Sequence, residues 1–471
     1  MRGTRCDVSL RRPGMRTIRF PARSGKIATE GPGLHPNAAT TIRKTRLRLL
    51  TPLLALLFLS TIDRANVSFA ALQMNAELGL TPETYGLGIS LFFVGYILVQ
   101  WPSLWLLQRI GMRRWVFVVA AVWGLAATGL AFVHSASGFY ALRLLLGVAE
   151  GGFAPGVMFY LSQWIPRRYR AAAISTFMLA VPVSSIVGGP LAGWLMSVNN
   201  PIDWAGWRWM LLIEGTPTLL VAIAALRLIP DRPRDAAWLD ADERSWLEDE
   251  VSRENLAQAD QHAGRGVLWN GRLWVASACW FGLMAGANGL LYWLPQILRH
   301  LSAQTSDARI GLITALPWIA VAAGMLTNAW HSDRTQERYL HVIVAAVGSA
   351  IFIALTPMLG TGALALTALL LAGFAMGAAQ GTFWTIPPLL LSPAGLATGF
   401  ALINMCGNLA GLVIPGFVGW VRERTGSFDI PVFAIAALGL LAAGAIAWLR
   451  ARPGAEAAKL EHAPINAPYS R

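Results

Sequence analysis

The sequence predicts an all-α membrane protein with 12 transmembrane helices in two six-helix bundles. Three observations lead to this prediction: 55% of the 471 residues are hydrophobic, only 13% are charged, and about a dozen apolar runs reach the length of a membrane span. Soluble domains carry about 25% charged residues, and a helix crosses the bilayer with about 20 apolar residues.

The apolar runs form two sets of six, separated by a long polar stretch. We expect the spans near residues 48–70, 87–108, 113–133, 139–164, 171–197 and 208–229, and then near 273–298, 309–331, 339–359, 362–388, 394–420 and 430–449. The predicted units are a disordered basic cytoplasmic tail (1–46), an N-terminal six-helix bundle (47–229), a cytoplasmic linker (230–272), a C-terminal six-helix bundle (273–450) and a cytoplasmic tail (451–471). Within the linker, Asp240 is expected to cap a surface helix that ends near Asn255.

Short basic clusters between the spans set the orientation of the chain, whose net charge is +13. The clusters that fall on one side of the membrane are 43–48, 109–114, 167–170, 334–338 and 450–452. Because cytoplasmic loops carry an excess of Lys and Arg, we expect both termini in the cytoplasm and a multi-pass monomer in a cell (inner) membrane. The basic residues are not gathered on one face, so the sequence does not favour nucleic-acid binding.

Four ionisable side chains within the spans are the basis of the functional prediction. Asp63 and Arg64 adjoin in the stretch STIDRANVSF of the first span, and Arg143 and Glu150 lie seven residues apart in the fourth. Seven residues are about two helical turns, so Arg143 and Glu150 share one helix face. A charge at the bilayer centre costs about 2.5–3.5 kcal/mol on insertion scales, and such a cost indicates a function. We expect these side chains to form a charge-balanced cluster inside the first bundle.

Such a cluster has the chemistry of a proton-coupled anion site. The planar guanidinium of Arg64 stays charged and fits a carboxylate, so Arg64 is the predicted substrate clamp, with Arg143 nearby. A proton can neutralise Asp63 or Glu150 and thereby release an arginine to hold substrate. Na⁺ could neutralise a carboxylate too, so the coupling ion stays open. The alternatives are a structural acid–arginine pair in the first span and helix bracing in the fourth, and Glu214 in the sixth span is interpreted as bracing.

Several long motifs resemble those of a known transporter family. The loop SDRTQER is similar to the signature loop of the major facilitator superfamily, and QRIGMRR is a weaker copy with Gln108 where an acid is typical. DRANVSFA, LRLLLGVAEGGFAPGVMFYLSQWIPRRYRA and FALINMCGNLAGLVIPGFVGW resemble the anion:cation symporter family. MLAVPVSSIVGGPLAGWLM and YWLPQIL resemble its bacterial tartrate and phthalate permeases. The resemblance covers residues from about 45 to 450.

This resemblance implies a fold and a set of site residues. The fold is the major facilitator fold, and the four charged side chains above are implied in coupling and binding. Further substrate-binding residues expected from it are Tyr96, Trp384, Asn404 and Asn408, and the expected gating-loop residues are Asp333, Arg334, Arg109 and Arg113.

We therefore expect a secondary active transporter that imports an organic carboxylate by proton symport, with alternating access to a midplane site. Tartrate-like, phthalate-like and hydroxyphenylacetate-like acids all stay open as substrates. Export of an aromatic or drug-like compound is the alternative, and a non-transporting membrane sensor is a remote one. Since the sequence has no phosphate-cradling loop and no His-rich metal spacing, we expect no enzyme activity, cofactor or metal. The expected partners are a small organic anion and the lipid bilayer.

Overall fold

A computed structural model describes residues 38–259, 267–301, 305–360, 362–391 and 395–452, and helices dominate these ranges. Twelve helical segments within them are long and apolar enough to cross a membrane. No strand occurs in the described ranges, so the predicted all-α class is confirmed. A helix satisfies its backbone polar groups within one segment, as the interior of a bilayer requires. The predictions for residues 1–37 and 453–471 lie outside the described residues.

The first half of the chain forms six spans from eight helices. These are α1 (Ala38–Leu78), α2 (Pro82–Ile110), α3 (Met112–Gly129), α4 (Ala136–Glu150), α5 (Phe153–Ser162), α6 (Arg167–Met178), α7 (Ala180–Ser197) and α8 (Gly206–Leu228), with the 3₁₀ turn η1 (Leu130–Phe132) after α3. The fourth and fifth spans are each broken into two helices. Pro155 and Pro182 explain the breaks, because each lacks the N–H that would bond to the carbonyl four residues earlier.

The linker and the second half contain the remaining elements. The linker holds η2 (Pro233–Asp235), α9 (Ala241–Ala259) and η3 (Val267–Trp269). The second six spans come from α10 (Gly271–Leu301), α11 (Asp307–Thr335), α12 (Tyr339–Met358), α13 (Ala363–Phe383), α15 (Leu396–Thr425) and α16 (Asp429–Ala451), with the short α14 (Pro387–Leu390) between the tenth and eleventh spans.

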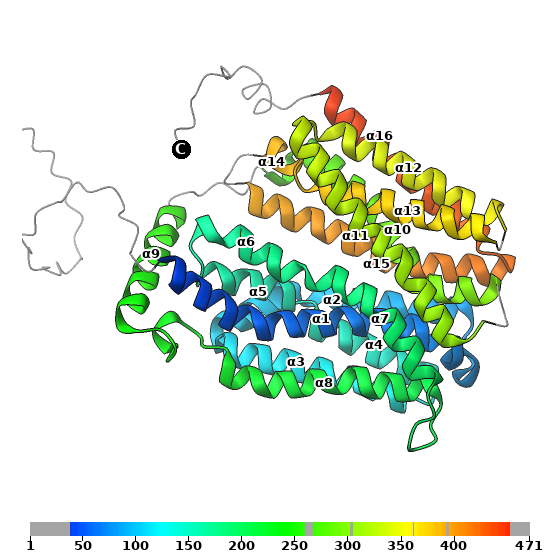
Figure 1. The fold of residues 1–471 in the computed structure, drawn as a ribbon, viewed down its shortest axis with the longest axis horizontal. Coiled ribbons are helices and arrows are strands. Elements are labelled where there is room, and N and C mark those ends of the chain that lie inside the picture. Colours follow the sequence, from blue (N-terminus) through cyan, green and yellow to red (C-terminus); the bar gives the residue numbers. More distant parts are fainter. Residues whose placement is uncertain (1–37, 260–266, 302–304, 361, 392–394, 453–471) are drawn as a thin grey trace, which may run out of the picture.

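The linker helix α9 packs against the start of α1. Asp240 caps α9, since its Oδ1 accepts a hydrogen bond from the Glu243 N–H at 2.8 Å, as the sequence predicts. Glu243 in turn accepts hydrogen bonds from Thr41 (3.1 Å) and Lys44 (2.7 Å) of α1. The expectation of a disordered tail through residue 46 is therefore wrong for residues 38–46, because these contacts hold them in the first turns of α1. Figure 1 shows α9 beside the beginning of α1.

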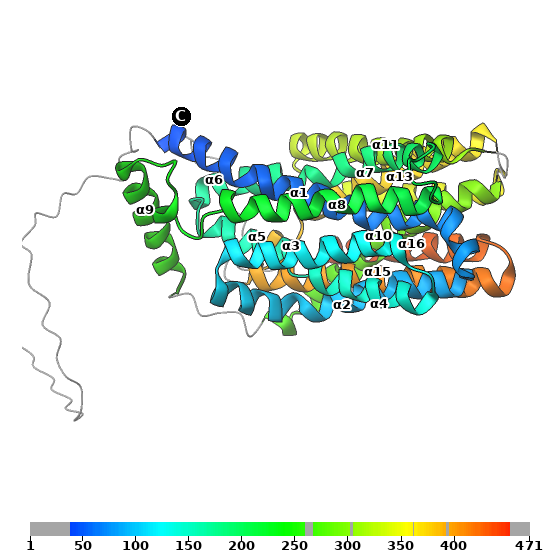
Figure 2. The same cartoon turned by 90° about the horizontal axis from the view of Figure 1, so that it is seen from below.

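The two halves of the chain meet at the end of the molecule that lies away from α9. Figure 1 shows them as two adjoining groups of helices that run side by side, and Figure 2 shows from below that α9 lies at one end of the molecule. Close helix contacts occur late in α7 and early in α11, where a Cβ on Gly311 would lie 2.3 Å from the carbonyl oxygen of Gly189. Early in α2, a Cβ on Gly86 would lie 2.5 Å from the carbonyl oxygen of Pro415 in α15. Small residues at these positions allow the helix backbones to approach closely.

Candidate functional site

Asp63 and Arg64 of α1 point in different directions, because successive residues on an α-helix are about 100° apart. The Arg64 Nε donates to Glu150 Oε2 of α4 at 2.8 Å. Asp63 Oδ2 instead accepts from the indole N–H of Trp123, on α3, at 2.7 Å. Asp63 is buried, whereas 25% of the Arg64 side chain is exposed. The acid thus faces the packed interior of the first bundle, and the arginine keeps a partly accessible guanidinium.

Glu150 is the ion-pair partner of Arg64. It lies at the end of α4 and is fully buried. Its Oε2 also accepts a hydrogen bond from the Ser60 hydroxyl at 2.8 Å, and Ser60 lies one turn before Arg64 on α1, so both donors share a helix face. Its other oxygen, Oε1, has no hydrogen-bond partner in the described ranges. A proton on Glu150 would remove the charge that holds Arg64 in this position.

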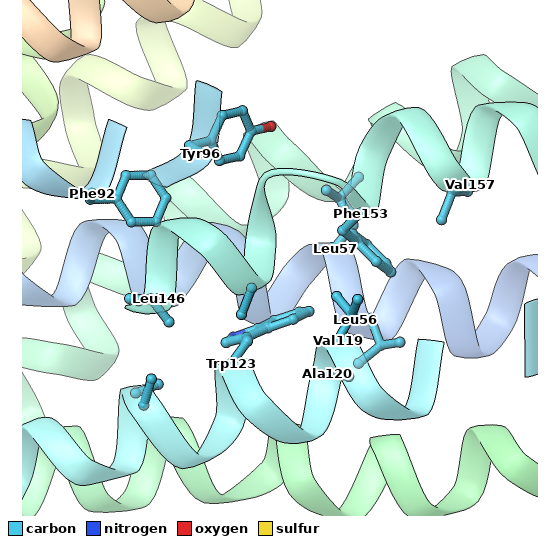
Figure 3. Packing of buried hydrophobic residues seen from close by; sticks show 14 of the residues in the cluster. Leu56, Leu57, Phe92, Tyr96, Val119, Ala120, Trp123, Leu146, Phe153 and Val157 are labelled. Atoms are coloured by element: carbon cyan, nitrogen blue, oxygen red, sulfur yellow. The ribbon is translucent and has the colours of Figure 1, made fainter. Parts of the chain in front are cut away.

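Two guanidinium groups lie close to a single aromatic ring on α2. The Cζ of Arg143 lies 4.8 Å from the centre of the Phe92 ring, and that of Arg64 lies 5.4 Å from it. Arg64 also lies over Tyr96, at 4.8 Å. Figure 3 shows Phe92 and Tyr96 as neighbours on α2. Arg143 is fully buried; none of its three guanidinium nitrogens meets the geometry of a hydrogen bond in the described part of the chain, and the Tyr292 side chain is the group able to bond to it. The arrangement concentrates positive charge beside an aromatic surface.

Tyr292 of α10 adds a polar group from the second half of the chain. It acts electrostatically on both Arg143 and Arg64. Its backbone carbonyl accepts a hydrogen bond from the Tyr85 hydroxyl of α2 at 3.1 Å, and its ring meets Phe93 edge-on with centroids 6.1 Å apart. Tyr292 is not among the residues predicted from the sequence, because a tyrosine within an apolar run carries no signal of its neighbours.

The predicted binding residues of the second half lie apart from this cluster. Trp384, directly after α13, packs edge-to-face on Trp280 with ring centroids 4.7 Å apart. Asn404 of α15 is exposed, while the amide nitrogen of Asn408 is buried and without a partner in the described ranges. Both asparagines continue the helix face of Gly411, where a Cβ would lie 2.2 Å from the Phe93 ring of α2. Within the described ranges, none of the three side chains forms a hydrogen bond or ring contact with the Arg64–Glu150 pair.

The last turn of α11, just before the loop to α12, contains two of the predicted gating residues. Asp333 pairs with Arg338 at 2.5 Å, and the guanidinium of Arg334 lies over the Trp330 ring at 4.0 Å. Glu337 in the same loop caps α12. Burial works to raise the pKa of its carboxyl, but hydrogen bonds from the first N–H groups of α12 and from a neighbouring histidine lower that pKa below its ordinary value. An ionised Glu337 therefore holds the start of α12.

At the loop between α2 and α3, the carboxylate that contacts the backbone comes from a residue outside the loop. Arg109 lies over the Trp105 ring at 3.7 Å, and the Arg113 side chain donates to the Ile229 carbonyl at 3.1 Å. Asp231, just after α8, accepts from the Arg113 backbone N–H at 2.9 Å. A Cβ on Gly111 would lie 2.7 Å from the same carboxylate oxygen. Gln108 stands at the position where an acid is typical in this loop. Asp231 thus supplies the carboxylate that this position lacks.

A further buried acid lies close to Asp63. Glu214 of α8 has an exposed fraction of 3%, and Asp63 and Asn66 of α1 are the polar groups that act on it. Neither carboxylate oxygen of Glu214 has a hydrogen-bond partner among the described residues. The Asn66 side chain is the group able to hydrogen-bond to Glu214, so a brace between α8 and α1 would consist of this one contact.

A cavity of about 580 Å³ lies in the second half of the chain, between α10, α11, α12, α13 and α16. Its walls are mainly apolar and include Ile297, Ile353 and Leu369, with Arg309 and Asp429 at its edge. None of the residues predicted for the site lines it. The charged cluster and this cavity are therefore separate features.

Comparison with known proteins gives consistent matches along the chain. The profile of the Major Facilitator Superfamily matches residues 53–415. A protein of Agrobacterium vitis, named as a candidate tartrate transporter, is 38% identical over 427 residues, which are 89% of this chain and 98% of that protein. A quinolone resistance transporter of Acinetobacter baumannii is 35% identical over 389 residues, which are 82% of this chain and 89% of that protein.

Solved structures match in fold. The xylose transporter of Escherichia coli in an inward-open conformation has a TM-score of 0.70 at 17% identity, covering 88% of this chain and 99% of that one. A likeness at this identity concerns the fold alone. The sequence relatives are transporters, so the protein is a membrane transporter and not an enzyme. The resemblance to tartrate permeases inferred from the motifs is confirmed by the first relative.

Proposed function

Because the chain belongs to the major facilitator superfamily, we propose that it is a secondary active transporter that imports an organic carboxylate together with protons. The observation that carries this proposal is the pair of guanidinium groups, Arg64 and Arg143, that both lie close to the Phe92 ring. A buried arginine requires a negatively charged or hydrogen-bonding partner, and a planar guanidinium binds a carboxylate through two parallel hydrogen bonds. An organic anion fits this requirement.

Glu150 couples the anion to the proton. While Glu150 is ionised, it occupies the Nε of Arg64, and only the outer nitrogens of the guanidinium are left for a substrate. Protonation of Glu150 removes its charge, so Arg64 exchanges the internal carboxylate for that of the substrate. Release of the substrate and of the proton on the other side restores the pair. Asp63 carries a second proton in this scheme, and H⁺ is the coupling ion, with Na⁺ as the alternative that the transport assay tests.

The substrate is an acid whose size matches the spacing of the two arginines. A tartrate-like or phthalate-like dicarboxylate can engage Arg64 and Arg143 together, whereas a hydroxyphenylacetate-like acid engages one of them and places its ring on Tyr96 or Phe92. Trp384, Asn404 and Asn408 line the opposite wall when the two bundles close around the substrate. The relative named for tartrate supports the dicarboxylate class.

The transporter works as a monomer in the inner membrane, with α9 and both termini in the cytoplasm. The basic residues near α9, including Lys44, Arg167 and Arg170, support this orientation through the positive-inside rule. In this orientation the glycine contacts between α7 and α11 and between α2 and α15 close the external end. The gating loops, with Arg109, Arg113, Asp333 and Arg334, then lie at the cytoplasmic end and hold the bundles during the opposite half of the cycle.

A second candidate function is export of an aromatic, drug-like compound. It is favoured by the 35% identity to a quinolone resistance transporter. In an exporter of this kind, apolar and aromatic contacts carry the substrate and Arg64 is dispensable. The two functions therefore differ in the direction of transport and in their need for the guanidinium.

The test is uptake into proteoliposomes under an inward proton gradient, with a labelled panel of the three acid classes. Arg64→Ala is the test variant, and Arg253→Ala is its control, because Arg253 lies on α9 with 71% of its side chain exposed. We expect one acid to accumulate with the wild type and the control but not with Arg64→Ala. Accumulation driven equally by an inward Na⁺ gradient would assign Na⁺ as the coupling ion. Absence of uptake together with drug efflux that survives Arg64→Ala would favour the exporter.

A further inference from the structure

Glu214 of α8 is a buried carboxyl group that the proposed cycle does not use. Its exposed fraction is 3%, and neither oxygen has a hydrogen-bond partner within the described residues. An ionised carboxylate in such a place would lack a counter-charge, and the Asn66 amide of α1 is the side chain able to donate to it. Buried groups of this kind take up a proton and become neutral, because keeping the charge costs far more free energy than protonation does.

The surroundings of Glu214 contain oxygen atoms able to accept a hydrogen bond from a protonated carboxyl group. Thr218 lies one turn further along α8, is fully buried, and has a hydroxyl without a partner in the described ranges. Across the contact with α3, a Cβ on Gly215 would lie 2.9 Å from the hydroxyl oxygen of Thr128, which likewise has no partner there. Hydroxyl groups accept as well as donate, and Thr218, four residues after Glu214, lies on the same helix face.

Asp63 is at least as deeply buried, with an exposed fraction of 1%, but it differs from Glu214 in its hydrogen-bond donors. Its two oxygens accept hydrogen bonds from Trp123 (2.7 Å) and Asn66 (3.4 Å), and donors of this kind favour the ionised form of a carboxyl group. Arg143 and Glu150 of α4 also act on Asp63. Among the residues that the structure describes, Asp63 is the charged group that acts on Glu214. On its own helix Thr218 lies one turn from Glu214, and on α3 the Thr128 hydroxyl lies beside Gly215, the next residue; both groups are uncharged.

The charges of the cluster do not balance unless one carboxyl group is protonated. Three buried carboxyl groups stand against two guanidinium groups, namely Asp63, Glu150 and Glu214 against Arg64 and Arg143. Two carboxyl groups that act on each other titrate as a pair and not independently. We propose that Glu214 and Asp63 form a proton-binding pair that holds one proton, on Glu214 in this structure, and that this proton passes to Asp63 during the transport cycle.

In this step the O–H bond of Glu214 breaks and an O–H bond forms on Asp63, so the total charge of the pair stays the same. The movement of the proton rests on the proposed symport function, whereas the protonation of Glu214 does not. The pair gives a physical role to the position of Asp63, which faces α3 and α8 and not the Arg64–Glu150 pair. It also adds Glu214 to the residues that couple protons to transport.

The first experiment needs no substrate. Infrared spectra of the purified full-length protein near neutral pH separate the carbonyl stretch of a protonated carboxyl group from the bands of carboxylates. We expect this acid band in the wild type and in the control Glu83→Gln, which removes a partly exposed acid at the start of α2. Glu214→Gln should lose the band. Glu214→Asp, which keeps an acid at this position, should shift the band without removing it.

Two infrared results would overturn the proposal. One is a spectrum of Glu214→Gln in which the acid band is unchanged. The other is an acid band that the wild type shows only after Na⁺ is replaced by choline, because Na⁺ would then be the normal occupant of the pair. If Glu214→Gln does not fold, the shift expected for Glu214→Asp decides, and an unshifted band overturns the proposal.

The second experiment tests whether the proton moves. Proteoliposomes with Glu214→Gln should lose accumulation of the transported acid under a proton gradient but keep counterflow, in which labelled and unlabelled acid exchange without a gradient. Full accumulation by Glu214→Gln would mean that the proton stays on Glu214, and proton sharing would be rejected. If the wild type itself transports none of the acids, the symport function fails, while the infrared result on Glu214 still stands.

Discussion

At the scale of single residues, Glu150 is the side chain on whose charge the proposed transport cycle depends most directly. Glu150→Gln keeps the shape of the side chain and its contact with Ser60, but it removes the charge that pairs with Arg64. We expect this variant to bind and exchange the substrate acid and to lose accumulation driven by a proton gradient. The paired measurements are counterflow and gradient-driven uptake in the same proteoliposome preparation.

Asp63→Asn provides the parallel measurement for the other predicted proton carrier. The coupling scheme requires that at least one of the two variants, Glu150→Gln or Asp63→Asn, loses gradient-driven accumulation. If both accumulate acid as the wild type does, the carboxyl groups have a structural role only. Loss of counterflow along with accumulation would instead indicate that Glu150 shapes the binding site.

Trp123 is predicted to stabilise the fold through its bond to Asp63. A hydrogen bond to a charged group contributes about 1.5–3 kcal/mol, against about 0.5–1.5 kcal/mol for a neutral pair. Trp123→Phe should therefore lower the free energy of unfolding more than Trp115→Phe does. Trp115 is the matched control, because it is equally buried and donates to the neutral hydroxyl of Ser103 at 3.1 Å. Equal losses, measured by denaturant unfolding in detergent, would show that Asp63 is uncharged.

The sequence predicted which side chains would gather but not how they pair. The cost of charge in a bilayer marks Asp63, Arg64, Arg143 and Glu150 as a group, and the helical repeat places the last two on one face. It does not reveal that Arg64 pairs across to α4 while its neighbour faces α3, because that depends on how α1 is rotated in the bundle. Glu214 was assigned to bracing for the same reason, since only the packing of α8 on α1 brings it to Asp63.

At the scale of helices, the docking of α9 on α1 depends on an ionised Glu243. Burial works to raise the pKa of this carboxyl group, but hydrogen bonds from Lys44, from the Asp240 N–H and from Thr41 lower that pKa below its ordinary value. A lowered pKa means that the stabilisation is complete above the ordinary glutamate pKa of about 4.3 and is lost as the pH falls through the lower value in the folded protein.

The measurement is hydrogen exchange of α9, expressed as protection factors that correct for the pH dependence of exchange itself. Protection should hold from neutral pH down to about pH 4, near the ordinary glutamate pKa, and fall below it. Glu243→Gln should show weakened protection already at neutral pH. Glu250→Gln serves as the control, because the ion pair of Glu250 is a long one of 3.9 Å to an exposed arginine. A wild-type profile that stays flat into strong acid would contradict the prediction.

The helix boundaries differ from the sequence-based prediction in the fourth and fifth spans and at the start of α1. The fourth and fifth spans were predicted as continuous because hydropathy is continuous through them. Pro155 and Pro182 nevertheless break them, as the missing N–H of proline requires. The early start of α1 could not be read from hydropathy, because residues 38–46 are polar and are ordered by contacts with α9, a helix about 200 residues away in the sequence.

At the scale of the whole molecule, the number and order of the spans follow from the sequence because the bilayer leaves the backbone few alternatives. Each apolar run of sufficient length must form a helix, and the twelve predicted runs correspond to the twelve candidate spans. Hydropathy carries no information about which end of the molecule is closed. That depends on contacts between the halves, such as the hydrogen bond from Gln73 to Asp307 (2.7 Å) and that from the Ala308 N–H to Ser197 (3.1 Å).

The last prediction uses these contacts to test alternating access. A cysteine pair at Ser197 and Ala308 joins α7 to α11 across the closed end, since the Ser197 hydroxyl already accepts from the Ala308 backbone. Oxidation to a disulfide should hold that end shut and abolish transport, and a reductant should restore it. Cysteines 279 and 406 are buried, and replacing all three native cysteines by alanine keeps the cross-link specific.

A second cysteine pair, at Arg167 and Glu254, joins α6 to α9 on one side of the molecule, where the carboxylate already accepts from the Arg167 N–H at 2.9 Å. The linker helix packs on the first six spans, so this disulfide ties together parts that move as one body and should leave transport intact. The contrast separates an effect of cross-linking from an effect of blocked rearrangement. If the disulfide between residues 197 and 308 forms fully and transport continues, the two halves need not separate at this end, and substrate reaches the arginines of the cluster by another route.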